Sequence, residues 1–251
     1  MTPLGARRLG LHRRDLLAAT VSVLAFLSSA QAATLKGIPD WSPNGGSPPQ
    51  PVRPGPWQFF SPEEGAVVEA LVDRLIPPDP NTPGGKEAGC AVFIDRQLAG
   101  PYGEARGLYM RPPFQDGDPQ QGYQSPLTPA MRYRRSLAAL DKYCQASFAG
   151  KRFHELPPDQ QDKLIAGLQS GTVKLENVSG RGFFELLLQN TQEGFFADPV
   201  YGGNRDFAGW RQVSFPGAQP VFTAADMQSR EAFTRAPIVG LQSRADNTRR
   251  G

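Results

Sequence analysis

Histidine and cysteine, which supply many catalytic nucleophiles, bases and metal ligands, are scarce in this 251-residue sequence. It contains two histidines and two cysteines. Because His12 lies in a segment typical of a cleaved signal, a Ser-His-Asp triad would have to use His154. His154 stands beside an expected helix start, where a solvated or capping histidine is the simpler interpretation. Cys90 and Cys144 lie 54 positions apart, so with one remaining histidine they cannot assemble a zinc or iron–sulfur ligand set.

The motifs by which a chain holds a redox cofactor are also missing from the sequence. It has no Cys-x-x-Cys-His for covalent haem, and no Gly-x-Gly-x-x-Gly follows a strand pattern. Carboxylate pairs such as Glu63/Glu64 and Asp95/Glu104 could in principle support a hydrolase. Such pairs are, however, common on helix surfaces and in helix caps. We therefore expect no catalytic residue, bound cofactor or metal in this chain.

The N-terminus is typical of a secretory signal. Basic residues precede an apolar run over residues 16–27, and Ala30-Gln31-Ala32 provides a small-x-small cleavage site. The run is too short to span a bilayer comfortably, which leaves a retained membrane anchor as the weaker alternative.

The arginine pair in this segment indicates the export route. Arg13 and Arg14 directly precede the apolar run, with Leu16 and Leu17 at the hydrophobic positions of a twin-arginine motif. This route carries proteins that are already folded, whereas ordinary secretion carries unfolded chains. We expect residues 1–32 to be a twin-arginine signal that leads to the periplasm.

Removal of that signal changes the charge of the chain. The signal would take four arginines and one aspartate from totals of 27 basic and 24 acidic residues, which leaves equal numbers of each. The basic surface that nucleic-acid binding needs is then absent. Nucleic acid is therefore not an expected partner.

The periplasm is oxidising, so Cys90 and Cys144 could pair there. Such a disulfide would stabilise the fold by about 3–4 kcal/mol on the chain-entropy model. Two buried free thiols, or a bridge to a partner chain, are the alternatives, because sequence cannot show whether the two residues are close enough.

The elements that position these residues are expected to be helices. Ser61-Pro62-Glu63-Glu64 combines an N-cap, a first-turn proline and a capping-box glutamate, and apolar residues follow at helical spacing. Similar signals predict helices over residues 62–75, 86–98, 129–148, 158–170 and 181–196. No stretch shows sustained period-two alternation. The fold class is therefore mainly α: a single irregular helical domain with long Pro/Gly-rich loops and extended N- and C-terminal arms.

Proline-rich and polar segments surround this body. We divide the chain into the signal (1–32), a Pro-rich arm (33–60), a helical domain (61–218) and a polar tail (219–251). Apolar residues near the end of the arm make docking on another surface plausible. A long loop over residues 100–127 separates the second and third helices, and loops of this length inside a domain are usually functional or bound to a partner.

The segment after the fifth helix is the most unusual. Asp198-Pro199 predicts a turn, and Gly202-Gly203-Asn204 tolerates positive φ. Such a loop could present Tyr201 and Trp210 outward to a partner. The alternative is an internal loop whose aromatic side chains fill the core.

The element Asp198-Pro199-Val200-Tyr201-Gly202-Gly203-Asn204, together with 75–79 and 93–95, resembles gluconate 2-dehydrogenase subunit 3. The resemblance covers residues 62–216, and the arm and tail lie outside it. It implies the small, non-catalytic subunit of a membrane-bound flavoprotein dehydrogenase. It also implies three partners: an FAD-binding large subunit, a multi-haem cytochrome c subunit and the twin-arginine translocase.

The resemblance further implies a location at the periplasmic face of the inner membrane, held through the partner subunits. FAD and haem c belong to those partners, and the large subunit holds the substrate, a sugar, sugar acid or polyol. Asp198, Tyr201, Gly202, Gly203, Asn204 and Trp210 are the expected partner interface. The alternative function is a free-standing periplasmic binding or structural protein.

Overall fold

The computed structural model describes residues 52, 55–115, 117–121, 124–217, 222–231 and 240–241. Every named element in these residues is a helix, and one isolated bridge joins Leu175 to Val178. The mainly helical fold class is therefore confirmed. The elements are α2 (Pro62–Leu75), α3 (Cys90–Leu98), η1 (Pro119–Gln121), α4 (Pro129–Ser147), η2 (Phe153–Glu155), α5 (Pro158–Ser170), α6 (Gly180–Phe196), η3 (Pro199–Tyr201), η4 (Arg205–Phe207), α7 (Ala208–Gln212) and α8 (Ala224–Gln228).

The predicted export signal lies outside the described residues. This applies to the twin-arginine residues Arg13, Arg14, Leu16 and Leu17 and to the cleavage-site residues Ala30 and Ala32. Each remains a prediction from the sequence.

Local capping chemistry determines where the first long helix begins. The Ser61 hydroxyl accepts the backbone N–H of Glu64 at 3.2 Å, and the Glu64 carboxylate accepts the backbone N–H of Ser61 at 2.9 Å. This reciprocal box satisfies two N–H groups that the helix itself leaves unbonded. The helix then buries Val67, Val68 and neighbouring apolar residues along one face.

The start of the second helix was predicted incorrectly. The expected helix from residue 86 begins instead at Cys90. Gly89 adopts φ +82, a left-handed conformation that interrupts helical geometry just before Cys90. The segment before it is turn-like, with the Cys90 N–H donated to the carbonyl of Gly85 at 3.0 Å.

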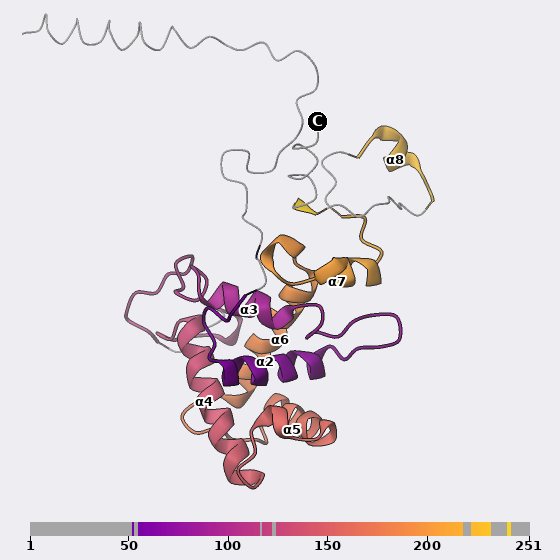
Figure 1. Cartoon of the computed structure of the whole chain (residues 1–251). Coiled ribbons are helices and arrows are strands. Elements are labelled where there is room, and N and C mark those ends of the chain that lie inside the picture. The colour runs from indigo at the N-terminus through magenta and orange to yellow at the C-terminus, as the bar shows by residue number, and fades with distance from the viewer. Residues whose placement is uncertain are drawn as a thin grey trace, which may run out of the picture. The chain divides into compact units, whose positions relative to one another are not determined.

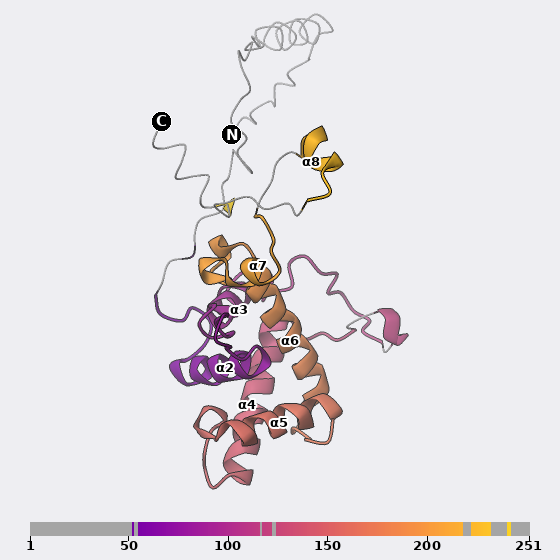
Figure 2. The same ribbon diagram turned by 90° about the vertical axis from the view of Figure 1, so that its right-hand side faces the viewer.

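The central helix of the body is α6. It packs against α2, α3, α4, α5 and α7, and Figures 1 and 2 show it running from α7 toward α5. Because the apolar faces of the other helices close around it, one hydrophobic core forms. Its largest fully buried apolar and aromatic side chains include Leu71, Ile94, Tyr133, Leu140, Phe153, Leu168, Leu187 and Phe195.

The end of the Pro-rich arm belongs to this body. Phe60 is buried in the core, and its ring meets those of Trp57 and Phe59 edge-on at centroid distances of 6.0 and 5.2 Å. Farther back, the Val52 N–H donates to the carbonyl of Val200 at 2.9 Å. The arm therefore contacts the helical body before α2 begins.

No helix in the described part of the chain has both the length and the apolar character needed to cross a membrane.

Candidate functional site

The loop after α6 starts with the predicted turn. The Asp198 carboxylate accepts the N–H of Val200 at 3.0 Å, Pro199 begins η3, and Gly202 ends it with φ +95. The aspartate side chain accepts a backbone N–H that the turn itself leaves unbonded. Proline at the first position has no backbone N–H, so it leaves no donor unsatisfied there.

Asn204 holds the loop closed. Its side chain is fully buried, accepts the N–H of Gly209 at 2.8 Å and donates to the carbonyl of Ala197 at 2.8 Å. Its backbone lies in the left-handed region at φ 47, which asparagine tolerates better than most residues. The amide therefore joins the end of α6 to the start of α7.

Two glycines allow the loop to lie directly on α6. A Cβ at Gly203 would approach the carbonyl oxygen of Gly194 to 2.1 Å, and a Cβ at Gly209 would approach that of Phe195 to the same distance. Both distances are far shorter than a Cβ contact can be. The Gly-rich sequence is therefore explained by close backbone packing inside the subunit.

The prediction that Trp210 points outward is wrong. Its indole is 8% exposed, donates Nε1–H to the carbonyl of Phe196 at 2.8 Å, and stacks on Phe207 with ring centroids 5.3 Å apart. The ring of Trp210 is therefore packed, and its N–H is hydrogen-bonded, within the subunit. Tyr201, by contrast, is 40% exposed, and Phe215, farther along the same segment, is 43% exposed.

The expected interface residues thus divide into two groups. Gly202, Gly203, Asn204 and Trp210 are buried in internal contacts, and Tyr201 alone of the six is exposed. Asp198 is half-buried, and its second carboxylate oxygen accepts the N–H of Leu241 at 2.7 Å. The loop therefore meets residue 241 of the tail as well as residue 52 of the arm, a role that the sequence did not reveal.

Asp95, one member of a carboxylate pair considered for acid–base chemistry, has a structural role. It is fully buried and accepts the backbone N–H groups of Gln58, Phe59 and Phe60 at 2.9, 2.9 and 3.0 Å. It also forms an ion pair with Arg96. Its oxygens are therefore occupied in holding the arm.

Glu104, the other member of that pair, lies on the surface. Its side chain is 56% exposed and forms an ion pair with Arg106. Asp95 is fully enclosed and Glu104 faces solvent, so the two do not make up a shared acid–base site.

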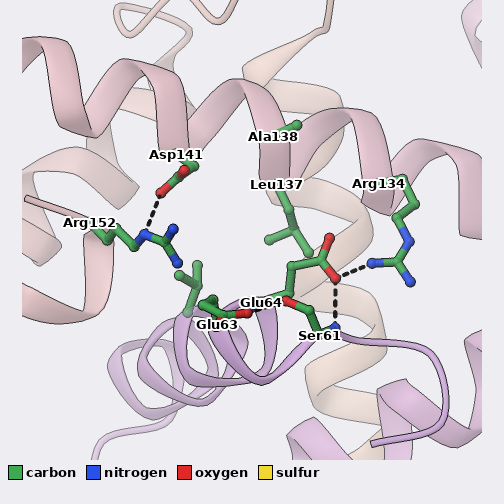
Figure 3. Close-up of a pocket in the computed structure, with 9 residues that line it drawn as sticks. Ser61, Glu63, Glu64, Arg134, Leu137, Ala138, Asp141 and Arg152 are labelled. Carbon is green, nitrogen blue, oxygen red and sulfur yellow. Dashed lines mark hydrogen bonds and ion pairs between the residues drawn. The ribbon is translucent and has the colours of Figure 1, made fainter.

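Glu63 and Glu64 line a cavity of about 300 Å³ between α2 and α4 (Figure 3). Across it Arg134 pairs with Glu64, and Arg152 lies 3.5 Å from Asp141. The pKa of Glu63 is lowered by a backbone hydrogen bond and by the Ser61 hydroxyl. The carboxylates here therefore serve in the cap of α2 and in ion pairs with arginines.

The two cysteines are free thiols, and the internal disulfide is not formed. Cys90 lies on α3, which packs chiefly on α2 and α6, whereas Cys144 lies on α4, which packs on α6 and η2. Burial raises the pKa of each thiol to about 12, so neither is a ready nucleophile.

His154 lies in η2, and its buried Nδ1 has no hydrogen-bond partner among the residues that the structure describes. It does not belong to a ligand set: the part of the chain that the structure describes contains no cluster of three or more His, Cys, Asp or Glu residues suited to a metal ion.

The fold and the loop after α6 define a small helical domain in which the carboxylates considered for catalysis serve in caps, ion pairs and the attachment of the arm. The family model of gluconate 2-dehydrogenase subunit 3 matches residues 62–217, more than half of the chain and the span from α2 to just beyond α7. The chain belongs to this family, whose members are accessory subunits of a multisubunit dehydrogenase. A search of curated proteins and a search of solved structures each found no match.

Proposed function

We propose that this chain is the non-catalytic small subunit of a flavoprotein dehydrogenase at the periplasmic face of the inner membrane. It binds the FAD-carrying large subunit, supports its maturation and carries it through twin-arginine export. A multi-haem cytochrome c subunit accepts the electrons. The observation that carries this proposal is the family match over residues 62–217.

The chemistry of the described side chains is consistent with a binding role. The Asp95 carboxylate is occupied by three backbone N–H groups, and both thiols are buried with pKa values raised to about 12. In this proposal the large subunit holds the substrate, which is a sugar, a sugar acid or a polyol.

The proposed effect on the large subunit is thermodynamic. A partner that binds only the folded, FAD-loaded state stabilises that state by mass action, by about 2.7 kcal/mol when its concentration is 100 times the Kd. Twin-arginine export accepts folded cargo, so one signal peptide can serve both chains when the complex forms before export.

The test is an export assay with charge-conserving variants. Changing Arg13 and Arg14 to Lys should leave the flavoprotein in the cytoplasm and abolish periplasmic dehydrogenase activity. The matched control changes the upstream pair, Arg7 and Arg8, to Lys and should export normally. Normal periplasmic activity in the Arg13→Lys/Arg14→Lys strain would contradict the proposal.

A further inference from the structure

A groove between α4 and the start of α6 contains a buried hydroxyl group that the fold does not use. The groove has a volume of about 590 Å³. Ser136 of α4 lines it, although this residue is only 5% exposed. The Ser136 hydroxyl makes no hydrogen bond with any residue that the structure describes. Because buried polar groups are hydrogen-bonded in the great majority of cases, an unbonded hydroxyl in the wall of a groove indicates a ligand.

The neighbours of Ser136 on α4 place it opposite the start of α6. Arg132, one turn earlier, donates to the carbonyl of Gly182 at 3.1 Å. Ala139, about one turn later, lines an adjoining cavity together with Val178. Ser136 lies between these two contacts on the same side of the helix, so its side chain faces the first turn of α6.

That first turn offers two further hydrogen-bond donors. The Ser179 hydroxyl accepts the N–H of Gly182 at 3.0 Å, and the Ser179 carbonyl accepts that of Phe183 at 2.9 Å. The N–H groups of Gly180 and Arg181 make no hydrogen bond within the part of the chain that the structure describes. The start of a helix attracts anions, because such N–H groups and the helix dipole both favour negative charge.

The groove also has an available cation. The guanidinium of Arg135 lines it and has no carboxylate partner among the described residues. Arg132 lines it as well, but its guanidinium is already bonded to the Gly182 carbonyl. Glu185, the one carboxylate among the described lining residues, is paired with Arg181 at 2.9 Å. A negative group in the groove therefore meets Arg135 without competition from an unpaired carboxylate.

Apolar side chains complete the lining: Leu127, Val178, Phe183 and Leu186. Pockets that bind small molecules measure about 300–1,000 Å³, so this groove has room for more than a lone ion. A ligand that suits both kinds of lining has an anionic group and an apolar chain.

We propose that this groove binds a small amphiphilic anion, an apolar chain that ends in a phosphate group. The phosphate oxygens accept hydrogen bonds from the Ser136 hydroxyl, from the Arg135 guanidinium and from the first N–H groups of α6. This set of donors suits the terminal oxygens of a phosphate. The chain of the ligand lies against the apolar part of the lining. The site does not depend on the proposed function, because each of its contacts comes from this chain.

The test titrates octyl phosphate into the full-length chain and measures its Kd by isothermal titration calorimetry. Ser136→Ala removes the buried hydroxyl, and Ser147→Ala, at an exposed serine of the same helix, is its control. Arg135→Gln removes the groove cation, and Arg211→Gln, at an exposed arginine outside the groove, is its control. We expect each groove variant to weaken binding about 10-fold and each control to stay within about twofold of the wild-type chain.

Thermal unfolding separates a ligand site from a purely structural role. A buried hydroxyl without a partner costs free energy, so Ser136→Ala should leave the thermal midpoint of the ligand-free chain unchanged or raise it. Octyl phosphate should raise the midpoint of the wild-type chain and have a smaller effect on this variant. A lower midpoint for the ligand-free variant would show that the hydroxyl serves the fold and would overturn the assignment.

Two further probes identify the chemistry that the groove recognises. Octanol, which lacks the anionic group, should bind at least about 10-fold more weakly than octyl phosphate. Equal affinities for the two, no binding of octyl phosphate, or equal losses in the groove and control variants would overturn the proposal. Flotation with phosphatidylcholine vesicles that contain phosphatidic acid, if lost in Ser136→Ala, assigns the site to a lipid head group. Binding of octyl phosphate without flotation assigns it to a free amphiphile.

Discussion

Asp95 accepts the backbone N–H of Phe60 at 3.0 Å across 35 residues of sequence, and both residues are buried. The same carboxylate accepts the N–H groups of Gln58 and Phe59. A carboxylate that satisfies several backbone donors is a strong local anchor. The arm is therefore bonded to α3, so its end is in place only when the helical body has folded.

Changing Asp95 to Asn tests this anchor. The amide removes the negative charge that pairs with Arg96 and directs an NH₂ group toward backbone donors. We expect the free energy of unfolding to fall by about 2–4 kcal/mol in urea titrations. The control is Glu104→Gln, because Glu104 is exposed and paired with Arg106 at the surface. This change should alter the free energy of unfolding by less than about 0.5 kcal/mol. Equal effects of the two changes would refute a structural role for Asp95.

Asn204 offers a second test because a matched residue exists. Asn204 and Asn177 both adopt left-handed φ, at 47° and 57°, but Asn177 is exposed. Asn177→Ala therefore measures the backbone cost alone, about 1 kcal/mol. Asn204→Ala should cost about 2 kcal/mol more, because it also leaves Gly209 N–H and the Ala197 carbonyl without their partner. Thermal unfolding of both variants would show the difference, and similar midpoints would contradict it.

Gly203 should tolerate no side chain. Its Cβ would lie 2.1 Å from the Gly194 carbonyl oxygen, so Gly203→Ala must push the loop off α6. We expect a loss of about 3 kcal/mol or more, with faster proteolysis after α6. Gly107→Ala is the control, since a Cβ there meets nothing within 4 Å. Equal protease resistance of both variants would show that the close approach is not required.

Alkaline pH should weaken the fold through the buried thiols. Burial raises the pKa of Cys90 and Cys144 from 9.0 to about 12, so the folded state retains protons that the unfolded state releases. Their contribution is complete below pH 9 and is lost as the pH rises from 9 toward 12. Between pH 8 and pH 10 we expect a loss on the order of 1 kcal/mol for each thiol.

The comparison that isolates this effect uses Cys90→Ala/Cys144→Ala. Urea titrations in reductant at both pH values should show a smaller fall for the double variant than for the wild-type chain. Identical falls would mean that other groups cause the alkaline loss.

The helix starts at Ser61 and Thr128 could be predicted because a cap and a following proline act within one turn. The role of Asp95 could not, because its partners lie more than thirty residues away and no local pattern encodes that contact. Trp210 was misplaced for the same reason: its orientation depends on the carbonyl of Phe196 in a different element.

The loop over residues 198–204, which carries the family resemblance, was expected to be a partner interface. The structure shows that it also has a role inside the subunit. Asp198, Gly203 and Asn204 define a loop that closes on α6, which is a folding requirement of the subunit itself. Exposure, by contrast, depends on which side of a loop the body covers. The outward position of Leu108 and Tyr109 therefore became visible only in three dimensions.

Native co-purification tests the central claim that this chain acts by binding a flavoprotein. A tagged full-length chain is isolated from its native host under mild conditions, and the FAD content per chain is measured by flavin absorbance after denaturation. We predict a yellow complex with one FAD for each small subunit and dehydrogenase activity on a sugar, sugar acid or polyol. A colourless chain without flavin, or a flavin-free chain that oxidises such a substrate alone, would contradict the claim.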